Sequence, residues 1–279
     1  MQDSYGFYDE EPSEKEWWAP HVQQFRELPL SDGEIVTISS GQSGTMPEVT
    51  YGELHRAMSL DSLQYIKWLQ KKAASHGVHF LKSSLPNDKG LQKILEGAQV
   101  ALSNSHRGAA DAFVNATGLS AGELCNDPKV HPIKGQTVLV KGEAKATRTR
   151  IGADYIAYCI PRPGSGTTIL GGTKVKEDWS TNVDDETTKN ILERLDKIAP
   201  ELKTAADGGF EVISVQCGLR PGRTGGPRVE MEAVGEHNVV HSYGHGSGGF
   251  QNSVGSARKV VQLIESSIGE PMKVIKAKM

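Results

Sequence analysis

The stretch HSYGHGSGGFQNSVG, His241–Gly255, joins an apolar run to a helical sequence through a glycine-rich turn. A strand that ends in glycines and opens a helix presents free backbone N–H groups and the positive end of the helix dipole. Glycine also lets a flat ligand approach the backbone closely. The segment therefore predicts a strand, a turn that can receive negative charge, and a helix with Val254, Ala257, Val261, Ile264 and Ile268 on one face.

Two histidines in the turn suggest a metal site as an alternative. His241 and His245 are four residues apart, but no third ligand lies near them in the sequence. Structural histidines are the better explanation, and we predict no metal. A single glycine turn remains weak evidence for a ligand by itself.

Length and composition indicate an ordinary globular protein. The chain has 279 residues, enough for one large domain or two moderate ones, with 37% hydrophobic and 23% charged residues. The net charge of −3 gives no electrostatic reason to expect nucleic acid or an anionic membrane as a partner. Three cysteines without a CxxC pair are typical of a reducing compartment rather than a disulfide framework. No apolar run reaches the ~18 residues of a membrane span.

Secondary-structure signals alternate at both ends of the chain. The spacing predicts a helix from Leu60 to Gly77 with Asp61 as N-cap, and then a strand over 78–85. An apolar strand, 112–118, runs into a glycine turn, so the sequon at Asn115 is interpreted as buried strand rather than a glycosylation site.

The middle of the chain is rich in strands. β-branched and aromatic runs separated by glycine and proline follow from 135 to 234, and one helix, around 186–200, interrupts them. We therefore expect an α/β fold: a nucleotide-type domain assembled from discontinuous segments, with an antiparallel-sheet domain inserted.

Three side chains in the middle segments suggest a polar pocket. Arg220 leaves an apolar strand at a proline, where a guanidinium can bind a carboxylate through two hydrogen bonds. Tyr158 and Lys174 belong to two strands that could face the same space. Taken singly, each residue is better explained without a pocket: Arg220 as a surface arginine, Tyr158 as a core tyrosine and Lys174 as an exposed lysine.

The combination and order of motifs is more specific than any one of them. VNATG, HPIKGQ, YCIPRPG, GLRPGR with PRVE, and YGHGSGGFQNS follow one another along the chain. Together they resemble the D-amino-acid oxidase and D-aspartate oxidase family of flavoenzymes, over about 60–268. The resemblance implies FAD as cofactor, and oxidation of a D-amino acid by dioxygen to a 2-oxo acid, ammonia and hydrogen peroxide.

The resemblance also implies roles for individual residues. Arg220 matches the arginine that binds the substrate carboxylate, Tyr158 matches a tyrosine that hydrogen-bonds it, and Ser247 matches a position facing the substrate amino group. No side chain is expected as a general base. The positions that match cofactor-binding residues are Leu85, Thr117, Gly118, Gly246, Ser247, Gly248, Gly249, Phe250 and Gln251.

Lys174 leaves substrate preference open between two classes. A cation here could pair with a side-chain carboxylate, as in a D-aspartate oxidase, but lysine is a looser partner than arginine. A general D-amino-acid oxidase is the favoured interpretation.

The implied domains are a Rossmann-like FAD-binding domain at 60–130 and 216–279, and a substrate-binding domain at 1–59 and 131–215. In such enzymes a strand–GxGxxG–helix unit comes first, whereas this chain begins with a segment that usually follows that unit. A cofactor-free, inactive relative is therefore a further alternative.

The last three residues, Ala277-Lys278-Met279, have the small-basic-aliphatic form of a peroxisomal address. They predict recognition by the peroxisomal import receptor and a place in the peroxisomal matrix, with the cytoplasm as the alternative. The sequence leaves a homodimer open.

Overall fold

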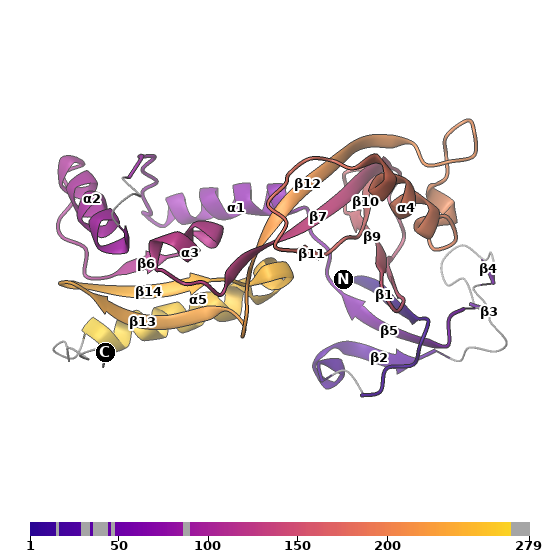
Figure 1. Ribbon diagram of the computed structural model, residues 1–279, viewed down its shortest axis with the longest axis horizontal. Coiled ribbons are helices and arrows are strands. Elements are labelled where there is room, and N and C mark those ends of the chain that lie inside the picture. Colours follow the sequence, from indigo (N-terminus) through magenta and orange to yellow (C-terminus); the bar gives the residue numbers. More distant parts are fainter. Residues whose placement is uncertain (15–16, 29–33, 36–43, 46–47, 86–89, 269–279) are drawn as a thin grey trace. The chain divides into compact units, whose positions relative to one another are not determined.

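The structure is a computed structural model that describes residues 1–14, 17–28, 34–35, 44–45, 48–85 and 90–268. The chain forms two compact units, shown in the ribbon of Figure 1. Unit 1 comprises residues 1–79, 135–174 and 180–218, and unit 2 comprises 80–134, 175–179 and 219–279. Two of the boundaries between them fall inside the long strands β7 (Val130–Lys141) and β12 (Val212–Arg223), and the others follow His79, Lys174 and Trp179.

Unit 1 is built on most of a large sheet, whose strand β11 and the ends of whose strands β7 and β12 belong to unit 2. Its strands follow the order β11-β7-β10-β9-β8-β1-β5-β2, with β12 paired to β7, and all its registered pairs are antiparallel except the parallel pair β1–β8. A separate hairpin joins β3 to β4. The strands not yet given bounds are β1 (Gln2–Tyr8), β2 (Gln23–Glu27), β3 (Glu34–Ile35), β4 (Gly44–Thr45), β5 (Tyr51–Ala57), β8 (Thr147–Ile151), β9 (Ile156–Arg162), β10 (Thr167–Gly171) and β11 (Val175–Lys176).

The core of unit 1 follows from strand alternation. In β9 every second residue is buried, including Ala157 and Cys159, and these side chains share a hydrophobic core with the helix α4 (Asp185–Asp196). Asp184 caps α4 by accepting a hydrogen bond from the Thr187 N–H at 2.7 Å. Ile191 and Leu195 then point into the core, where both are fully buried.

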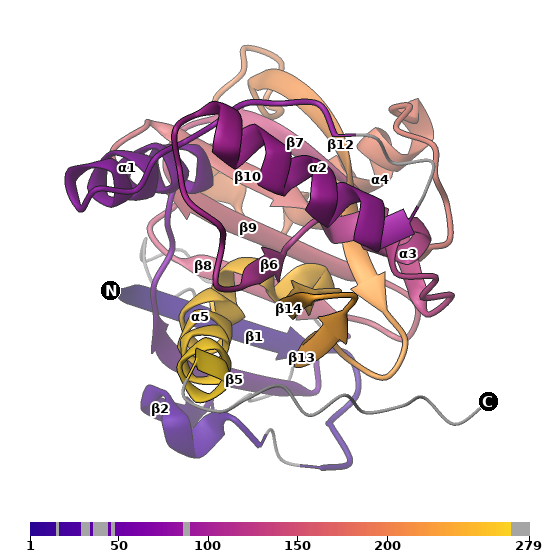
Figure 2. The same cartoon turned by 90° about the vertical axis from the view of Figure 1, so that its left-hand side faces the viewer.

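Unit 2 contains a smaller sheet between helices. Its order is β13 (Arg228–Val234), β14 (His237–Tyr243) and β6 (Phe113–Asn115), with β14 and β6 parallel. Figures 1 and 2 show α5 (Gly249–Ile268) on one side of this sheet. On the other side lie α2 (Gly90–Asn104) and α3 (Ala121–Leu124). The parallel pair places the ends of β6 and β14, and the turns that follow them, at the same edge.

Short 3-10 turns mark several loops: η1 (Ala19–His21), η2 (Gly118–Ser120), η3 (Pro200–Leu202) and η4 (Gly246–Gly248). None of the helices within the described ranges is both long and apolar enough to cross a membrane.

The helix predicted from Leu60 is confirmed as α1 (Ser62–Ser75), and Asp61 is its N-cap, accepting from the N–H groups of Leu63 and Gln64. Its apolar side is not buried, however, since Leu63, Ile66 and Leu69 are exposed. The spacing predicted the helix correctly but not its packing.

Two other expectations were wrong. Residues 78–85 form no strand: Val78, Phe80 and Leu81 are exposed, and no described strand pairs with the segment. A β-like sequence needs a hydrogen-bonding partner to become a strand. The helix face predicted for α5 also differs, because Val260 is its buried residue whereas Val254 and Val261 are exposed.

The units and the predicted domains divide the chain differently at 60–79, which clusters with unit 1 rather than with the C-terminal segment, and at 175–179, which joins unit 2. They also differ by a few residues at 131–134, which lies in unit 2, and at 216–218, which lies in unit 1. The assignment of a ligand to either domain stays a prediction.

Candidate functional site

The glycine turn predicted at 244–249 lies between β14 and α5. Gly244 has φ of +82° and Gly246 has φ of +55°, a region that favours glycine. Gly244, Gly246 and Gly249 also have the GxGxxG spacing, a signal that the sequence analysis did not use. The backbone is open at its helical end, because a Cβ added at Gly249 would meet no atom within 4 Å.

The helix that follows gives the turn an electrostatic character. Gly249 is the first residue of α5, a helix of 20 residues, so the N–H groups of its first turn have no partner within the helix. His245 fixes the turn to this helix through Nε2, 2.9 Å from the Ser256 hydroxyl. Burial lowers the pKa of His245, so the imidazole is neutral at pH 7. The turn therefore offers backbone donors and the positive end of a dipole.

The turn after β6 lies beside the glycine turn in unit 2. Asn115 is 4% exposed, which confirms the interpretation of its sequon as buried strand. Its side-chain oxygen accepts hydrogen bonds from the Thr117 N–H at 3.2 Å and the Thr117 hydroxyl at 2.8 Å. Its amide nitrogen donates to Nδ1 of His241 at 3.1 Å, directly across the β6–β14 pair. Asn115 thus links the Thr117–Gly118 turn to β14.

The strand that carries Arg220 reaches the same two turns. Gly222 forms an antiparallel bridge with His245, and a Cβ at Gly118 would lie 3.9 Å from the side chain of Pro221. Arg220 itself is half-buried two residues earlier in β12. Unit 2 therefore brings the Arg220 strand, the Thr117–Gly118 turn and the glycine turn together.

His241 is a structural histidine in this arrangement. It is fully buried, and Nε2 lies 2.9 Å from a carboxylate oxygen of Glu232. Since Asn115 donates to Nδ1, the proton of the neutral ring is on Nε2 and is donated to Glu232. Burial, together with the nearby Arg228, lowers the pKa of His241 despite Glu232. Among the described residues no group of three His, Cys, Asp or Glu side chains could hold a metal ion.

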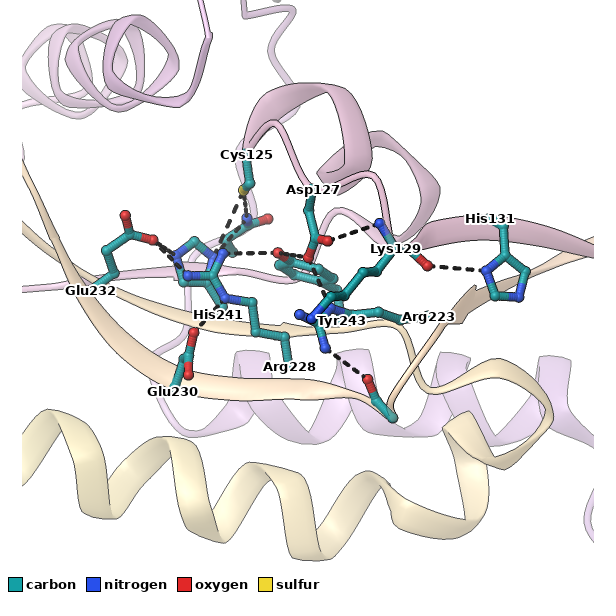
Figure 3. Close-up of polar contacts among 12 residues, drawn as sticks. Cys125, Asp127, Lys129, His131, Arg223, Arg228, Glu230, Glu232, His241 and Tyr243 are labelled. Carbon is teal, nitrogen blue, oxygen red and sulfur yellow. Dashed lines mark hydrogen bonds and ion pairs between the residues drawn. The ribbon is translucent and has the colours of Figure 1, made fainter. Parts of the chain in front are cut away.

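A partly buried polar network continues from His241 (Figure 3). Arg228 contacts Glu232 at 2.8 Å and donates to the hydroxyl of Tyr243 at 3.0 Å. Tyr243 in turn donates to Asp127 at 3.0 Å, and Arg223 donates to the same carboxylate oxygen at 2.8 Å. Sequence analysis missed this network, because its members are dispersed from 115 to 243 and no local pattern shows that they contact one another.

The remaining predicted residues are distributed over both units. In unit 1, Tyr158 lies in β9, where a Cβ at Gly171 would be 2.3 Å from its ring, and Lys174 is exposed three residues after β10. In unit 2, Leu85 lies outside any strand, so its expected place in a strand is wrong. Residues 277–279 lie outside the described residues.

The exposed part of the glycine turn fits a flat cofactor. Ser247, Gly249, Phe250 and Gln251 are exposed, and a Cβ added at Gly249 would meet no atom within 4 Å beyond its chain neighbours and the helix backbone. A flavin ring needs such an open stretch of backbone, and an electron-rich ring is favoured by the N-terminus of α5.

Comparison with known proteins shows the family. The FAD dependent oxidoreductase family (DAO) matches residues 10–263. A D-amino-acid oxidase of Fusarium vanettenii is 29% identical over 96% of this chain and 70% of its own length. That of Schizosaccharomyces pombe is 32% identical over 88% of this chain and 66% of its own, and that of Dictyostelium discoideum is 38% identical over 57% and 44%. The chain thus spans 66% of the length of the Schizosaccharomyces pombe protein and 44% of the length of the Dictyostelium discoideum protein.

Solved structures show the fold. Glycine oxidase from Geobacillus kaustophilus has a TM-score of 0.66 at 18% identity, covering 95% of this chain and 71% of that one. Fructosamine oxidase from Aspergillus fumigatus has a TM-score of 0.61 at 14% identity, covering 98% and 68%. The expected α/β fold class is confirmed. By its sequence match over residues 10–263, the chain belongs to the family of FAD dependent oxidoreductases.

Proposed function

We propose that the protein oxidises D-amino acids, with FAD as the electron acceptor and dioxygen as the final oxidant. The products are a 2-oxo acid, ammonia and hydrogen peroxide. The observation that carries this proposal is the convergence, in unit 2, of the glycine turn, the Thr117–Gly118 turn and the strand of Arg220. Curated D-amino-acid oxidases that match most of the chain support the same substrate class.

FAD, when bound, accepts the hydride from the substrate Cα. The chain's own part is to hold cofactor and substrate. Residues Gly246–Gln251 would lie along the ring, with Leu85, Thr117 and Gly118 as the other cofactor contacts. The first turn of α5 would direct its N–H groups toward this ring and would stabilise negative charge on it.

Arg220 would bind the substrate α-carboxylate through a charge-assisted, bidentate hydrogen bond. Tyr158 would donate its hydroxyl hydrogen to the same carboxylate, and Ser247 would accept from the substrate amino group. Together these contacts orient the Cα–H bond toward the cofactor. Orientation of this kind can supply several kcal/mol of rate acceleration, and it needs no general base.

An acidic substrate is the second candidate, because Lys174 is exposed beyond β10 and carries the charge that a side-chain carboxylate would need. The products of either reaction include peroxide, which suits a peroxisomal location. The terminal Ala277-Lys278-Met279 would supply the address, and a fluorescent fusion with and without these three residues would test it.

The decisive experiment is a visible absorption spectrum of the purified chain with and without added FAD. Protein-bound flavin bands that bleach under anaerobic D-alanine, but not under L-alanine, establish the proposed activity. Faster bleaching by D-aspartate than by D-alanine selects the acidic substrate. A protein that retains no flavin after gel filtration from excess FAD is the cofactor-free relative instead.

The variant Arg220→Met separates the two halves of the proposal. It leaves the glycine turn unchanged, so the flavin bands remain, while bleaching by D-alanine becomes much slower. Loss of the flavin bands in this variant would place Arg220 in the cofactor site or in folding rather than on the substrate.

A further inference from the structure

Asp127 occupies the centre of the buried polar network in unit 2. It lies between α3 and β7, and its side chain is 9% exposed. One carboxylate oxygen accepts a hydrogen bond from the Lys129 N–H at 3.1 Å and fixes the loop locally. The other accepts from Arg223 at 2.8 Å and from Tyr243 at 3.0 Å.

Arg223 connects this carboxylate to the strand of Arg220. It is the last residue of β12, three positions after Arg220, a distance of about 10 Å along an extended strand. A second guanidinium nitrogen donates to the carbonyl of Gly226 at 3.1 Å, and the Thr224 N–H donates to the Lys129 carbonyl at 3.0 Å. The end of β12 is therefore fastened to the loop of Asp127 through a side chain and through the backbone.

Tyr243 connects the same carboxylate to the glycine turn. It is the last residue of β14, directly before Gly244, and is 2% exposed. Because Arg228 can only donate to the Tyr243 hydroxyl, the hydroxyl hydrogen is directed to Asp127. Burial and the hydrogen bond to Asp127 raise the pKa of Tyr243 to about 12, so this hydrogen is retained at any physiological pH.

The chemistry of the position calls for an ionised carboxylate. Three donors converge on the two oxygens of Asp127, and an asparagine offers only one acceptor oxygen. Burial would raise the pKa of Asp127, but the hydrogen bonds from Arg223, Lys129 and Tyr243 outweigh it and lower the pKa. The negative charge is thus present throughout the neutral range.

We infer that Asp127 is a positioning residue of the proposed oxidase site, holding the strand end that carries Arg220 and the strand end that opens the glycine turn in a fixed relation. This inference rests on the proposed function, because those two segments are its substrate and cofactor contacts. Asp127 touches neither ligand itself; it acts through Arg223 on one side and Tyr243 on the other.

The contacts of Asp127 with Tyr243 and with Arg223 can be removed separately by substitution. Tyr243→Phe removes only the hydroxyl, and Arg223→Met removes only the guanidinium donors. We expect Tyr243→Phe to weaken FAD affinity about tenfold with little change in the KM for D-alanine of the FAD-saturated enzyme. Arg223→Met raises that KM about tenfold with a smaller change in FAD affinity. Asp127→Asn shows both effects.

Glu201→Gln is the matched control. Glu201 forms a similarly buried ion pair with Arg148 at 2.5 Å, but within unit 1. We expect the Glu201→Gln variant to be less stable than the wild type, with the same FAD affinity and the same KM for D-alanine. If Asp127→Asn has the same FAD affinity and KM as this control, the inference is overturned. It is also overturned if Tyr243→Phe and Arg223→Met change FAD affinity and KM equally.

Amide hydrogen exchange keeps the test independent of the proposed function. Asp127→Asn increases exchange at residues 222–224 and 243–248, while Glu201→Gln does not. If the wild-type protein binds no FAD, the proposed function fails and the role of Asp127 in an oxidase site fails with it; the exchange pattern then shows only whether Asp127 holds the two strand ends together. If Asp127→Asn does not fold, Tyr243→Phe decides it in the same way, by faster exchange at 243–248 alone.

Discussion

Gly244 lies against Arg223 so closely that a Cβ on the glycine would be 2.6 Å from the Cβ of the arginine. Gly244 also has φ of +82°. The turn after β14 and the end of β12 therefore contact each other where only a hydrogen atom fits. This contact makes the glycine turn and the strand of Arg220 one structural feature of unit 2.

Gly244→Ala tests this close approach. The alanine must adopt the left-handed backbone conformation of Gly244, and its methyl group must displace Arg223. We therefore expect a loss of about 2–4 kcal/mol in the free energy of unfolding. Urea denaturation followed by circular dichroism measures it. A loss below about 0.5 kcal/mol would show that the turn relaxes without cost.

Gly249→Ala is the companion variant at the open end of the same turn. A Cβ there meets nothing within 4 Å, and Gly249 is helical, so stability is unchanged or rises by up to about 1 kcal/mol. The methyl group nevertheless occupies the backbone surface proposed for the flavin, and FAD affinity falls. Flavin fluorescence titration measures that affinity. Unchanged FAD affinity would move the cofactor away from Gly249.

Arg220→Lys keeps the charge but loses the planar, bidentate donor pair. We expect the KM for D-alanine to rise about 10- to 100-fold, the equivalent of one charge-assisted hydrogen bond, while the flavin spectrum stays the same. Steady-state oxygen consumption measures the change. A KM equal to that of the wild type would exclude Arg220 from the substrate site.

Lys174→Met tests substrate preference. If Lys174 faces the substrate side chain, kcat/KM for D-aspartate falls about tenfold while that for D-alanine stays the same. Lys189→Met, an exposed lysine of α4, is the control with the same change of charge. Equal losses on both substrates would assign Lys174 to structure rather than to specificity.

The buried imidazoles predict a dependence of stability on pH. Burial lowers the pKa of His241, and likewise of His55 and His245, below the usual value of 6.5. As pH falls below 6.5, the unfolded chain takes up protons that the folded protein resists, so the unfolded state gains stability. The free energy of unfolding therefore decreases from pH 7 toward pH 5, by at most about 1.4 kcal/mol per pH unit for each histidine.

His241→Gln should flatten this pH dependence, because it removes one of the three imidazoles whose pKa burial lowers. Urea denaturation at pH 5, 6 and 7 makes the comparison. A slope unchanged by His241→Gln would show that Glu232 keeps the folded imidazole as readily protonated as the unfolded one.

The sequence predicted elements well where the signal is local. Asp61 caps α1, the apolar segment before Gly118 forms β6, and the strand–turn–helix at 237–268 is β14, η4 and α5. Each depends on residues within one or two turns of each other. Local signals failed where a distant partner decides: 78–85 has a strand-like sequence but pairs with no described strand.

The order of motifs also predicted the family, because a series of short motifs in a fixed order is far less degenerate than any single glycine turn. Whether the apolar faces of α1 and α5 are buried was not predictable, since an amphipathic sequence says which residues are apolar but not what covers them. Val260, rather than Val254 or Val261, is buried in α5 because β13 and β14 pack against that side.

By itself, then, the sequence determined the fold class, the family and the chemical types available to a site. Only the tertiary structure brought Asn115, Asp127, Arg223 and Tyr243 into one network, over separations of up to 126 residues between bonded partners. The physical reason is that a buried carboxylate or imidazole is stable only with partners at hydrogen-bond distance. Those partners are fixed by the packing of β6, β12 and β14, and no local pattern records that packing.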